Sequence, residues 1–378
     1  MAGIYLHIPF CKQACHYCDF HFSTSLKYKD EMLKAIHTEL LLQKQYLSGE
    51  PIETIYFGGG TPSLLIGEEI ESLIDHIANI YPLSSEAEIT LEANPDDLDL
   101  QNIRKLRTSN VNRFSIGIQS FFQEDLRWMN RAHTATEAEG SVKRLQDAGF
   151  ENITLDLIYG YPFLTDEKLK ANIQKVKDLL VPHISAYSMT VEPKTALATL
   201  IRKGLQQAMN ESQSAEQFLI LLESLTEAGF EQYEISNFAC DKRYSKHNSN
   251  YWKGIPYLGI GPSAHSFNGR TRQWNVANNA KYMESIHKKV VPAEEEILTE
   301  VNRLNEYIMT SLRTMWGTNL NKIQQEFGSD YRNKIEETIE EFINKEHIKK
   351  KEGIVTLTTE GKLFADKIAS DLFVEELI

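Results

Sequence analysis

The sequence predicts an α/β protein built on a partial (β/α)6 TIM-type barrel, followed by a C-terminal helical, winged-helix-like domain. Across the first 240 residues, short apolar and β-branched runs alternate with longer segments of helical periodicity, a pattern typical of repeated βα units and a parallel sheet. Polar residues follow the ends of successive predicted strands, as they do at the active-site rim of a barrel. A flat, doubly wound sheet is the alternative architecture.

The barrel is predicted from six strands with helices between them. The strands are expected at residues 4–8, 54–57, 88–92, 113–118, 153–158 and 184–189. Helical periodicity of the apolar residues predicts helices at 29–45, 68–80, 136–148 and 166–180, with a further helix within 205–230 and a strand at 231–238. Six units are too few to close an eight-stranded barrel, so we expect an open one.

Three regions are expected along the chain: a core over residues 1–235, a loop-rich segment over 236–290 that packs on the core, and a domain over 291–378. Residues 239–272 are rich in Gly, Ser, Asn and aromatic residues with little periodicity, which predicts an irregular region near a site. The last region combines helices with a short strand pair in HIKKKEGIVTLT, which is the winged-helix pattern. Its acidic residues argue against DNA binding.

Composition narrows the class of protein. The chain has 378 residues, is 25% charged and carries a formal net charge of −13, which disfavours a broad nucleic-acid-binding surface. No apolar run is long enough for a transmembrane segment, and the first residues lack a secretory signal. We therefore expect a cytoplasmic protein and no nucleic-acid partner, and we leave peripheral membrane contact open.

Three of the four cysteines, Cys11, Cys15 and Cys18, follow the first predicted strand with the spacing Cys-x3-Cys-x2-Cys. Such crowding is a poor disulfide framework and indicates a metal or cluster site. Three thiolates can bind three irons of one 4Fe-4S cluster and leave the fourth iron open for chemistry. A zinc site completed by His16 or His21 is the alternative, although structural zinc sites usually take their ligands from two separated turns.

Further polar groups lie at the carboxyl ends of the later strands, which a parallel barrel brings to one rim. A glycine-rich loop allows close approach of a ligand to the backbone, and carboxylates suit ribose hydroxyls. Each residue also has an ordinary structural explanation, such as a turn, a helix cap or an ion pair. The candidates are Gly58, Gly59 and Gly60 in YFGGGTP, Glu92 in LEANP, Gln119 in SIGIQS, Asp156 in LDLIYG, and Tyr187 with Ser188.

The cysteine spacing and the YFGGGTP segment resemble the radical S-adenosylmethionine (SAM) superfamily. The resemblance implies that SAM chelates the open iron, and that an electron from the reduced cluster releases a 5′-deoxyadenosyl radical. It also implies that SAM is bound by residues of the rim: Tyr5, Tyr17, Gly59, Gly60, Thr61, Glu92, Gln119, Arg131, Asp156 and Ser188.

Within the superfamily the chain resembles the oxygen-independent coproporphyrinogen oxidase group. The matching segments are YLHIPFC, FGGGTPS, SIGIQSF, NRAH, DLIYGYP and GPSAHSF. The genuine oxidases have a fourth cysteine two positions after the third and a long N-terminal extension. Here that position is Phe20, and only ten residues precede Cys11. Both departures disfavour porphyrinogen decarboxylation.

The other subgroup, the radical SAM haem chaperones, shares the Cys-x3-Cys-x2-Cys-x-Phe start and an HNxxYW segment, here residues 247–252. This resemblance implies haem binding at His247, Tyr251 and Trp252, because a histidine can supply an axial imidazole while flat rings cover a macrocycle. A loop held by its own Asn and aromatic groups is the ordinary explanation. The weaker ligand candidates are His7, His133, His183, His265 and Cys240.

The resemblance thus implies a haem chaperone that binds haem, one three-cysteine 4Fe-4S cluster and SAM, and that passes haem to an acceptor protein. A reductant for the cluster is a further implied partner. Whether the chain is an enzyme stays open, and no catalytic residue is singled out. Two enzymatic alternatives remain: oxygen-independent coproporphyrinogen III oxidase, and an RNA-modifying radical SAM enzyme.

Overall fold

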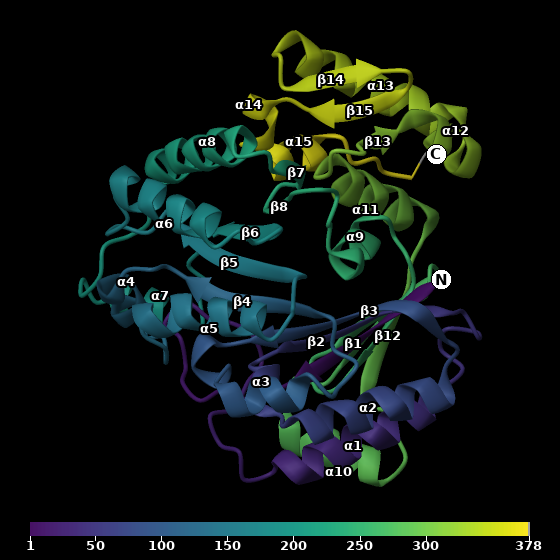
Figure 1. Cartoon of the computed structure of the whole chain (residues 1–378). Coiled ribbons are helices and arrows are strands. Elements are labelled where there is room, and N and C mark those ends of the chain that lie inside the picture. The colour runs from purple at the N-terminus through teal and green to yellow at the C-terminus, as the bar shows by residue number, and fades with distance from the viewer. Residues whose placement is uncertain (377–378) are drawn as a thin grey trace.

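The computed structural model describes residues 1–376 and contains all six expected parallel strands (Figure 1). They run in chain order across a curved sheet, each hydrogen-bonded to the next in parallel register. This arrangement confirms the partial barrel over the flat doubly wound sheet. The strands are β1 (Ala2–Ile8), β2 (Ile52–Gly59), β3 (Leu83–Ala93), β4 (Arg113–Gln119), β5 (Ile153–Tyr159) and β6 (His183–Ser188).

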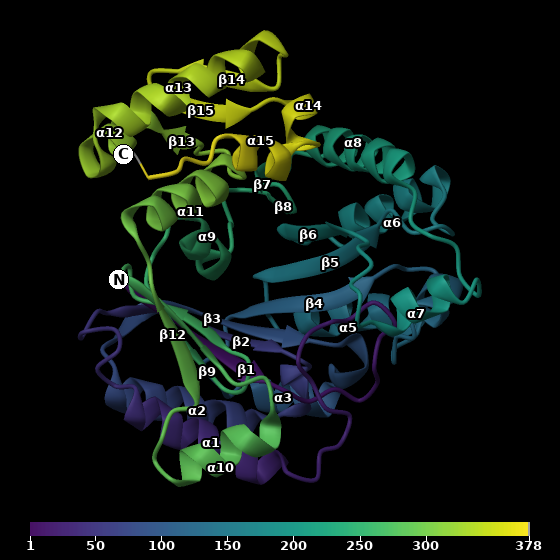
Figure 2. The ribbon, with the colours of Figure 1, turned by 180° about the vertical axis from the view of Figure 1, so that it is seen from behind.

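Helices between the strands cover the outer side of the curved sheet (Figures 1 and 2). Their ends follow from local sequence: in α5, Thr134 and Glu137 form a capping box, and Thr165 caps α6 through the Lys168 amide. The helices of this layer are α1 (Lys29–Leu42), α2 (Gly67–Ile80), α3 (Leu100–Leu106), α5 (Ala135–Asp147), α6 (Asp166–Asp178) and α8 (Glu211–Glu227). The short helices α4 (Gln123–Trp128) and α7 (Ala196–Arg202) lie by the cysteine loop, where backbone bonds join His16 to Met129 and Leu197.

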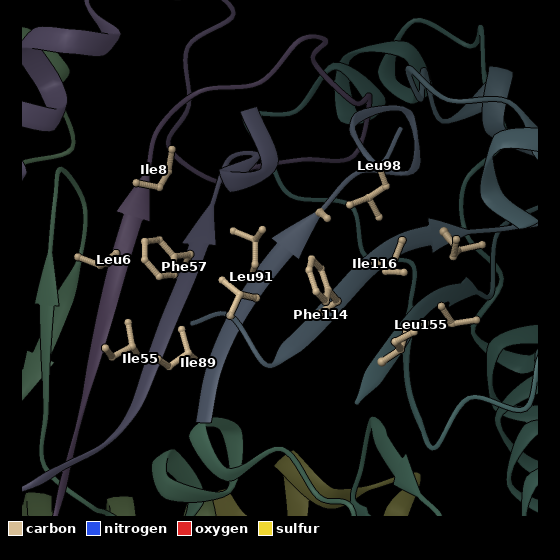
Figure 3. Close-up of a cluster of buried hydrophobic side chains, with 14 of the residues drawn as sticks. Leu6, Ile8, Ile55, Phe57, Ile89, Leu91, Leu98, Phe114, Ile116 and Leu155 are labelled. Atoms are coloured by element: carbon tan, nitrogen blue, oxygen red, sulfur yellow. The ribbon is translucent and has the colours of Figure 1, made fainter. Parts of the chain in front are cut away.

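The core of the barrel lies between the sheet and these helices. Alternate strand residues point toward the helices and are apolar, for example Leu6, Phe57, Leu91 and Ile116, which lie side by side in Figure 3. All four are fully buried. The intervening residues face the inside of the barrel, because successive side chains of a strand point to opposite faces.

The inner face of the barrel is polar, and its side chains bond to each other across neighbouring strands. The Tyr56 hydroxyl donates to Glu92 Oε1 over 2.8 Å, and the Ser115 hydroxyl donates to Asp156 Oδ1 over 3.2 Å. A barrel lined in this way has room for polar ligands and not only for a packed core.

After β6 the sheet continues at both edges. On the β6 side a hairpin of β7 (Glu231–Glu234) and β8 (Asn237–Ala239) forms where one strand was expected at 231–238. On the β1 side lie β9 (Tyr257–Ile260), which is parallel to β1, then β10 (His265–Phe267), β11 (Thr271–Asn275) and β12 (Ala293–Ile297). The expectation of an irregular region over 239–272 was wrong in part, since α9 (Lys246–Trp252), β9 and β10 are regular while the segments between them are not. Helix α10 (Asn279–His287) packs on α1.

A second hydrophobic cluster, beginning at Leu304 and ending at Val374, forms the core of the C-terminal domain. Its helices and a three-stranded sheet with a β14–β15 hairpin have the winged-helix arrangement expected from the sequence. The elements are α11 (Glu300–Leu312), β13 (Thr318–Asn319), α12 (Leu320–Phe327), α13 (Ser329–Asn344), β14 (Ile348–Lys351), β15 (Ile354–Leu357), α14 (Thr359–Lys362) and α15 (Ala365–Asp371). Among residues 1–376, no helix is both long and apolar enough to cross a membrane.

Candidate functional site

A cavity of about 450 Å³ opens at the carboxyl ends of the barrel strands. It is bounded by the loop that carries the three cysteines, by the glycine segment after β2, and by the ends of β3 to β6. The three cysteines and nine of the ten residues predicted to bind SAM line it: Cys11, Cys15, Cys18, Tyr17, Gly59, Gly60, Thr61, Glu92, Gln119, Arg131, Asp156 and Ser188. The sheet topology thus brings together residues that lie far apart in the sequence.

The cysteine loop has no regular secondary structure and is held by contacts to the rim. The Cys11 amide donates to Ser23 O, and the His16 amide donates to Met129 O, both over 3.0 Å. The Lys12 ammonium pairs with Asp96 and Asp97, which follow β3. These anchors direct the loop toward the cavity.

All four cysteines are free of disulfide bonds, and those in the loop are half-buried. Burial raises the pKa of the Cys18 thiol to about 11 and also raises the pKa of Cys11. Ionised sulfurs at these positions therefore require a compensating positive charge, which metal ions supply.

Arg131 contributes one such charge. Its Nη1 lies 3.3 Å from Cys15 Sγ and 3.4 Å from the Tyr17 hydroxyl, and its Nη2 donates to Asn94 Oδ1 over 2.6 Å and to Gly117 O over 2.9 Å. Its Nε is buried without a partner. The guanidinium joins the cysteine loop to the ends of β3 and β4 and faces the cavity.

The glycine segment is crowded by the first strand. A side chain at Gly60 would place a Cβ 2.6 Å from the carbonyl oxygen of Phe10, and one at Gly59 would lie 2.8 Å from the His7 ring. Gly59 also has φ of +106°, a conformation that favours glycine. The glycines therefore let the segment approach both the cavity and the start of the cysteine loop.

Two carboxylates, Glu92 and Asp156, lie at the base of the cavity. Burial raises the pKa of Glu92 to about 7 and that of Asp156 to about 6, and like-charge repulsion from Asp156 adds to the shift of Glu92. Near neutral pH these groups change their charge easily, and a ligand that donates hydrogen bonds favours their ionised forms.

Two more candidates have distinctive local geometry. Gln119 is buried at the end of β4 with φ of +67°, which is unusual for a side chain other than glycine and typical of functional sites. The hydroxyls of Ser188 and Ser214 lie 2.6 Å apart, so Ser188 is also tied to helix α8.

Tyr5 is the one predicted SAM residue that does not line the cavity. Its ring stacks on that of Tyr56 at 6.1 Å inside the barrel, and its hydroxyl lies 3.2 Å from His7 Nδ1. Tyr5 thus packs against Tyr56, whose hydroxyl bonds Glu92 at the base of the cavity.

The HNxxYW segment forms α9, which lies at the opposite end of the barrel, near the start of the strands (Figure 1). His247 is only 2% exposed, and burial lowers its pKa to about 3. Its Nδ1 lies 2.7 Å from Thr54 Oγ1 and its Nε2 lies 2.9 Å from the Tyr251 hydroxyl. Its ring stacks on Tyr56 at 4.9 Å. Trp252 packs under the Arg313 guanidinium of the second domain.

The weaker histidine candidates are dispersed. His7 and His133 lie near the cysteine-loop end and bond to the carbonyls of His21 and Ile118. His183 is buried between Thr154 and Tyr233 at the other end of the barrel. His265 is exposed on β10, and the Cys240 thiol contacts Gly229 O at 3.6 Å.

The residues present fit a cluster better than a zinc ion. Within residues 1–376, no three His, Cys, Asp or Glu side chains are close enough to hold a single metal ion. His16 bonds to Trp128 O and His21 to Asn279 Oδ1 through ring nitrogens. In a 4Fe-4S cluster each cysteine binds a different iron, so the sulfurs stand farther apart. The three thiols on one cavity wall, with an arginine at Cys15, suit that group.

Sequence reasoning missed two residues that complete the site. Asn94 accepts a hydrogen bond from Arg131 and donates to Thr61 Oγ1 over 3.2 Å, so it joins the glycine segment to the arginine that contacts Cys15. Ser115 bonds Asp156 from the neighbouring strand. Asn94 lies two residues after Glu92 in LEANP, and its position at a strand end was the available signal. For Ser115 the signal was the alternation of polar and apolar residues in β4.

Two family models match parts of the chain. A family model described as the radical SAM superfamily matches residues 5–176, and one described as the HemN C-terminal domain matches residues 298–364. Coproporphyrinogen III oxidase (HemN) from Escherichia coli, a radical SAM enzyme, has a similar structure, with a TM-score of 0.83 over 98% of this chain and 90% of that chain. The sequence identity is 22%, so this likeness establishes the fold alone.

Closer sequence relatives share one name. Heme chaperone HemW of Bacillus subtilis (strain 168) is 35% identical over 97% of this chain and 98% of its own length. Heme chaperone HemW of Lactococcus lactis (strain IL1403) is 33% identical over 99% of this chain and 97% of its own. The protein of that name from Escherichia coli (strain K12) is 36% identical over 70% of this chain and 69% of its own.

Proposed function

The chain belongs to the heme chaperone HemW family of radical SAM proteins, and we propose that it is a haem chaperone that binds haem, one 4Fe-4S cluster and SAM, and delivers haem to an acceptor protein. The observation that carries the proposal is the relationship to the proteins named HemW, which extends over 97% or more of the chain in the first two relatives. A reductant for the cluster and a site of action in the cytoplasm belong to the same proposal.

In this proposal Cys11, Cys15 and Cys18 bind three irons and SAM occupies the cavity beside them. When bound, the cluster supplies an open iron and an electron to the SAM sulfonium. The protein's own contribution is binding and orientation. Three thiolates on one wall of the cavity, fixed by Ser23 and Met129, support the assignment of the cluster.

The SAM assignment rests on the polar base and rim of the cavity. Glu92 and Asp156 are acceptors suited to ribose hydroxyls, and hydrogen bonds donated by those hydroxyls would favour the ionised carboxylates that burial disfavours. Arg131 places its positive charge beside Cys15, where it could also pair with the SAM carboxylate. Tyr17, Gly59, Gly60, Thr61, Gln119 and Ser188 form the remaining walls.

Haem is assigned to the HNxxYW segment with His247 as the axial ligand. Both ring nitrogens of His247 have partners, so iron ligation requires α9 to move and the bond to Thr54 or Tyr251 to break. Movement of α9 also requires release of the Lys246 and His247 amides from Glu88 of β3.

Phe20 argues for the chaperone over the oxidase. It occupies the position at which the oxidases that the chain resembles have a fourth cysteine, and it is 68% exposed at the edge of the cavity. The fold shared with HemN makes oxidative decarboxylation the alternative to be tested.

The test is a haem titration of the anaerobically reconstituted protein, followed by optical spectra with and without SAM. We expect one haem per chain and no conversion of coproporphyrinogen III in the same preparation. Absence of haem binding, or formation of protoporphyrinogen, would overturn the proposal. Cys11→Ala should remove cluster absorbance while haem still binds.

Two variants test the haem ligand. His247→Ala should weaken haem binding and shift the Soret band. Tyr251→Phe should strengthen binding or accelerate it, because it frees Nε2 of His247 from its 2.9 Å partner. If His247 serves only to hold α9 in place, both variants lower stability and neither changes the spectrum of bound haem.

A further inference from the structure

A second cavity, of about 410 Å³, lies at the opposite end of the barrel from the cysteines. Its walls are the start of β2, the middle of β3, the residue before β5, and α9 with the loop that precedes it. No residue of this cavity belongs to the one at the cysteine loop. It is therefore a separate site, next to the HNxxYW segment.

Four cations converge on this cavity although the chain as a whole carries a net charge of −13. They are Lys242, Arg243, Lys246 and Lys253, all exposed at the surface. Such a concentration in an acidic protein creates a local positive field that attracts anions.

The acidic residues nearby do not cancel this charge. Glu88 lines the cavity but is buried, and its carboxylate accepts hydrogen bonds from the backbone amides of Lys246 and His247, at 3.2 and 3.1 Å. Glu53 also lines it, and Glu151 pairs with Arg243 across 3.6 Å at the rim. Counting Glu151, three carboxylates face the four cations, so the cavity keeps a small positive excess.

Buried donors in the same wall have no partner. Ser249 is 4% exposed, and its hydroxyl makes no hydrogen bond, nor does the Nδ2 of Asn250. Asn152 adds an unpartnered acceptor, its Oδ1. Buried polar groups are almost always bonded in folded proteins. Two unpartnered donors beside four cations suit a ligand that carries acceptor oxygens.

Aromatic rings flank the cavity on the side of the second domain. Tyr244 lines the cavity, its ring lies 6.0 Å from that of Trp316, and the Lys253 ammonium sits 4.3 Å from the Trp316 ring centre. Flat apolar rings beside cations suit a ligand that combines an aromatic body with anionic groups.

We propose that this cavity binds the two propionate carboxylates of haem, with the macrocycle edge against Tyr244 and α9. The inference rests on the proposed haem chaperone function and adds the groups that recognise the porphyrin side chains. Lysine and arginine supply the charge, and the Ser249 hydroxyl and Asn250 amide supply hydrogen bonds to carboxylate oxygens. The site would select dicarboxylate porphyrins over neutral ones.

The test compares haem with haem dimethyl ester, in which both carboxylates are esterified, on the unaltered full-length protein. Haem should bind at least about tenfold more tightly than its ester, since two charge-assisted contacts are lost. The double variant Lys242→Gln/Lys246→Gln should weaken haem binding about two- to thirtyfold and leave binding of the ester unchanged. The control is Lys349→Gln/Lys351→Gln, on exposed β14 of the second domain.

The outcomes separate the two proposals. If the unaltered protein binds no haem, the proposed function fails and this inference with it. If it binds haem and the ester equally, and the charge variant binds haem as tightly as the control does, the propionate site is overturned while the chaperone proposal stands.

Discussion

At the scale of single residues, Glu92 is held at a cost to stability. Burial raises its pKa from 4.5 to about 7 in the folded protein, and Asp156 adds to the shift. Between these two pH values the folded state binds more protons than the unfolded state, so this residue's contribution to stability is greatest at or below pH 4.5 and is lost as pH rises through 7. A carboxylate that destabilises the fold at neutral pH indicates a role in binding.

Glu92→Gln should therefore stabilise the apoprotein at pH 8 by about 1–3 kcal/mol and have little effect at pH 5, where the carboxylate is already protonated. The Tyr56 hydroxyl can still donate to the amide oxygen. The measurement is urea unfolding under reducing conditions at both pH values. The same variant should weaken SAM binding by the reconstituted protein at pH 8.

The matched control is Glu337→Gln, an exposed carboxylate in α13, which should leave stability unchanged at both pH values. A loss of stability in Glu92→Gln at pH 8 would mean that the ionised carboxylate serves the fold and not a ligand.

Gly60 tests the crowding around the cysteine loop. Gly60→Ala would place a methyl group 2.6 Å from Phe10 O, so the backbone must shift just before Cys11. We expect iron incorporation to fall several-fold after reconstitution, measured by iron and sulfide content. Gly140→Ala in α5 is the control, because its methyl would meet only the end of the Arg144 side chain. Equal cluster content in both variants would remove Gly60 from the support of the loop.

At the scale of elements, the first half of the fold was predictable from sequence because each strand carries its own apolar residues. Strands β1 to β6 begin and end within a few residues of the expected bounds, apart from β3, which starts earlier at Leu83. Strand β9 was missed because its four residues, YLGI, pair with β1 about 250 residues away, and nothing local specifies that partner. The β7–β8 hairpin was read as one strand since Ile235 and Ser236 give no clear turn signal.

The candidate cavity was predictable for a related reason. Parallel strands end at one rim, so polar residues at strand ends converge whatever their separation in sequence. Tyr5 does not line the cavity because it lies in the middle of β1, farther from the carboxyl ends of the strands than the lining residues. The burial of His247 was not foreseen either, because a histidine beside polar residues gives no sign that Thr54 and Tyr251 will enclose it.

The cysteine loop is an element without helix or strand, so its order depends on side-chain anchors. Lys12 is the charged anchor, and its removal leaves Asp97 buried without its cation. Lys12→Met should destabilise the protein by about 1–3 kcal/mol and accelerate loss of the cluster in air. The measurement is the bleaching rate of cluster absorbance. The control is Lys27→Met, later in the same loop, where the lysine is stacked only on Tyr28; its cluster absorbance should bleach at the rate of the unaltered protein. Equal bleaching rates for the unaltered protein and both variants would show that Lys12 does not order the loop.

At the scale of the whole molecule, two hydrophobic cores meet through polar contacts at the β7 edge of the sheet. Backbone bonds join Ile235 to Arg313 and Met315 to Tyr233, at 3.2 and 3.0 Å. The Arg313 guanidinium pairs with buried Glu234 across 3.3 Å and covers the ring of Trp252 in α9. The second domain thus contacts the helix that carries the proposed haem ligand, and a change at that contact would reach α9.

Arg313→Met tests this junction, because it leaves Glu234, whose side chain is 1% exposed, without its cation. Removing one partner of a buried ion pair lowers the free energy of unfolding by several kcal/mol. Because Arg313 is partly exposed, we expect a loss of about 2–3 kcal/mol here. Urea unfolding should show the loss, and Glu234→Gln added to Arg313→Met should recover part of it, since the buried charge is then gone. Asp366→Asn removes the other, exposed partner of the same guanidinium and should change stability by less than about 0.5 kcal/mol. If the single and double variants were equally unstable, the junction would depend on the packing of Arg313 against Trp252 and not on charge. Any coupling between the second domain and α9 would then act through that packing.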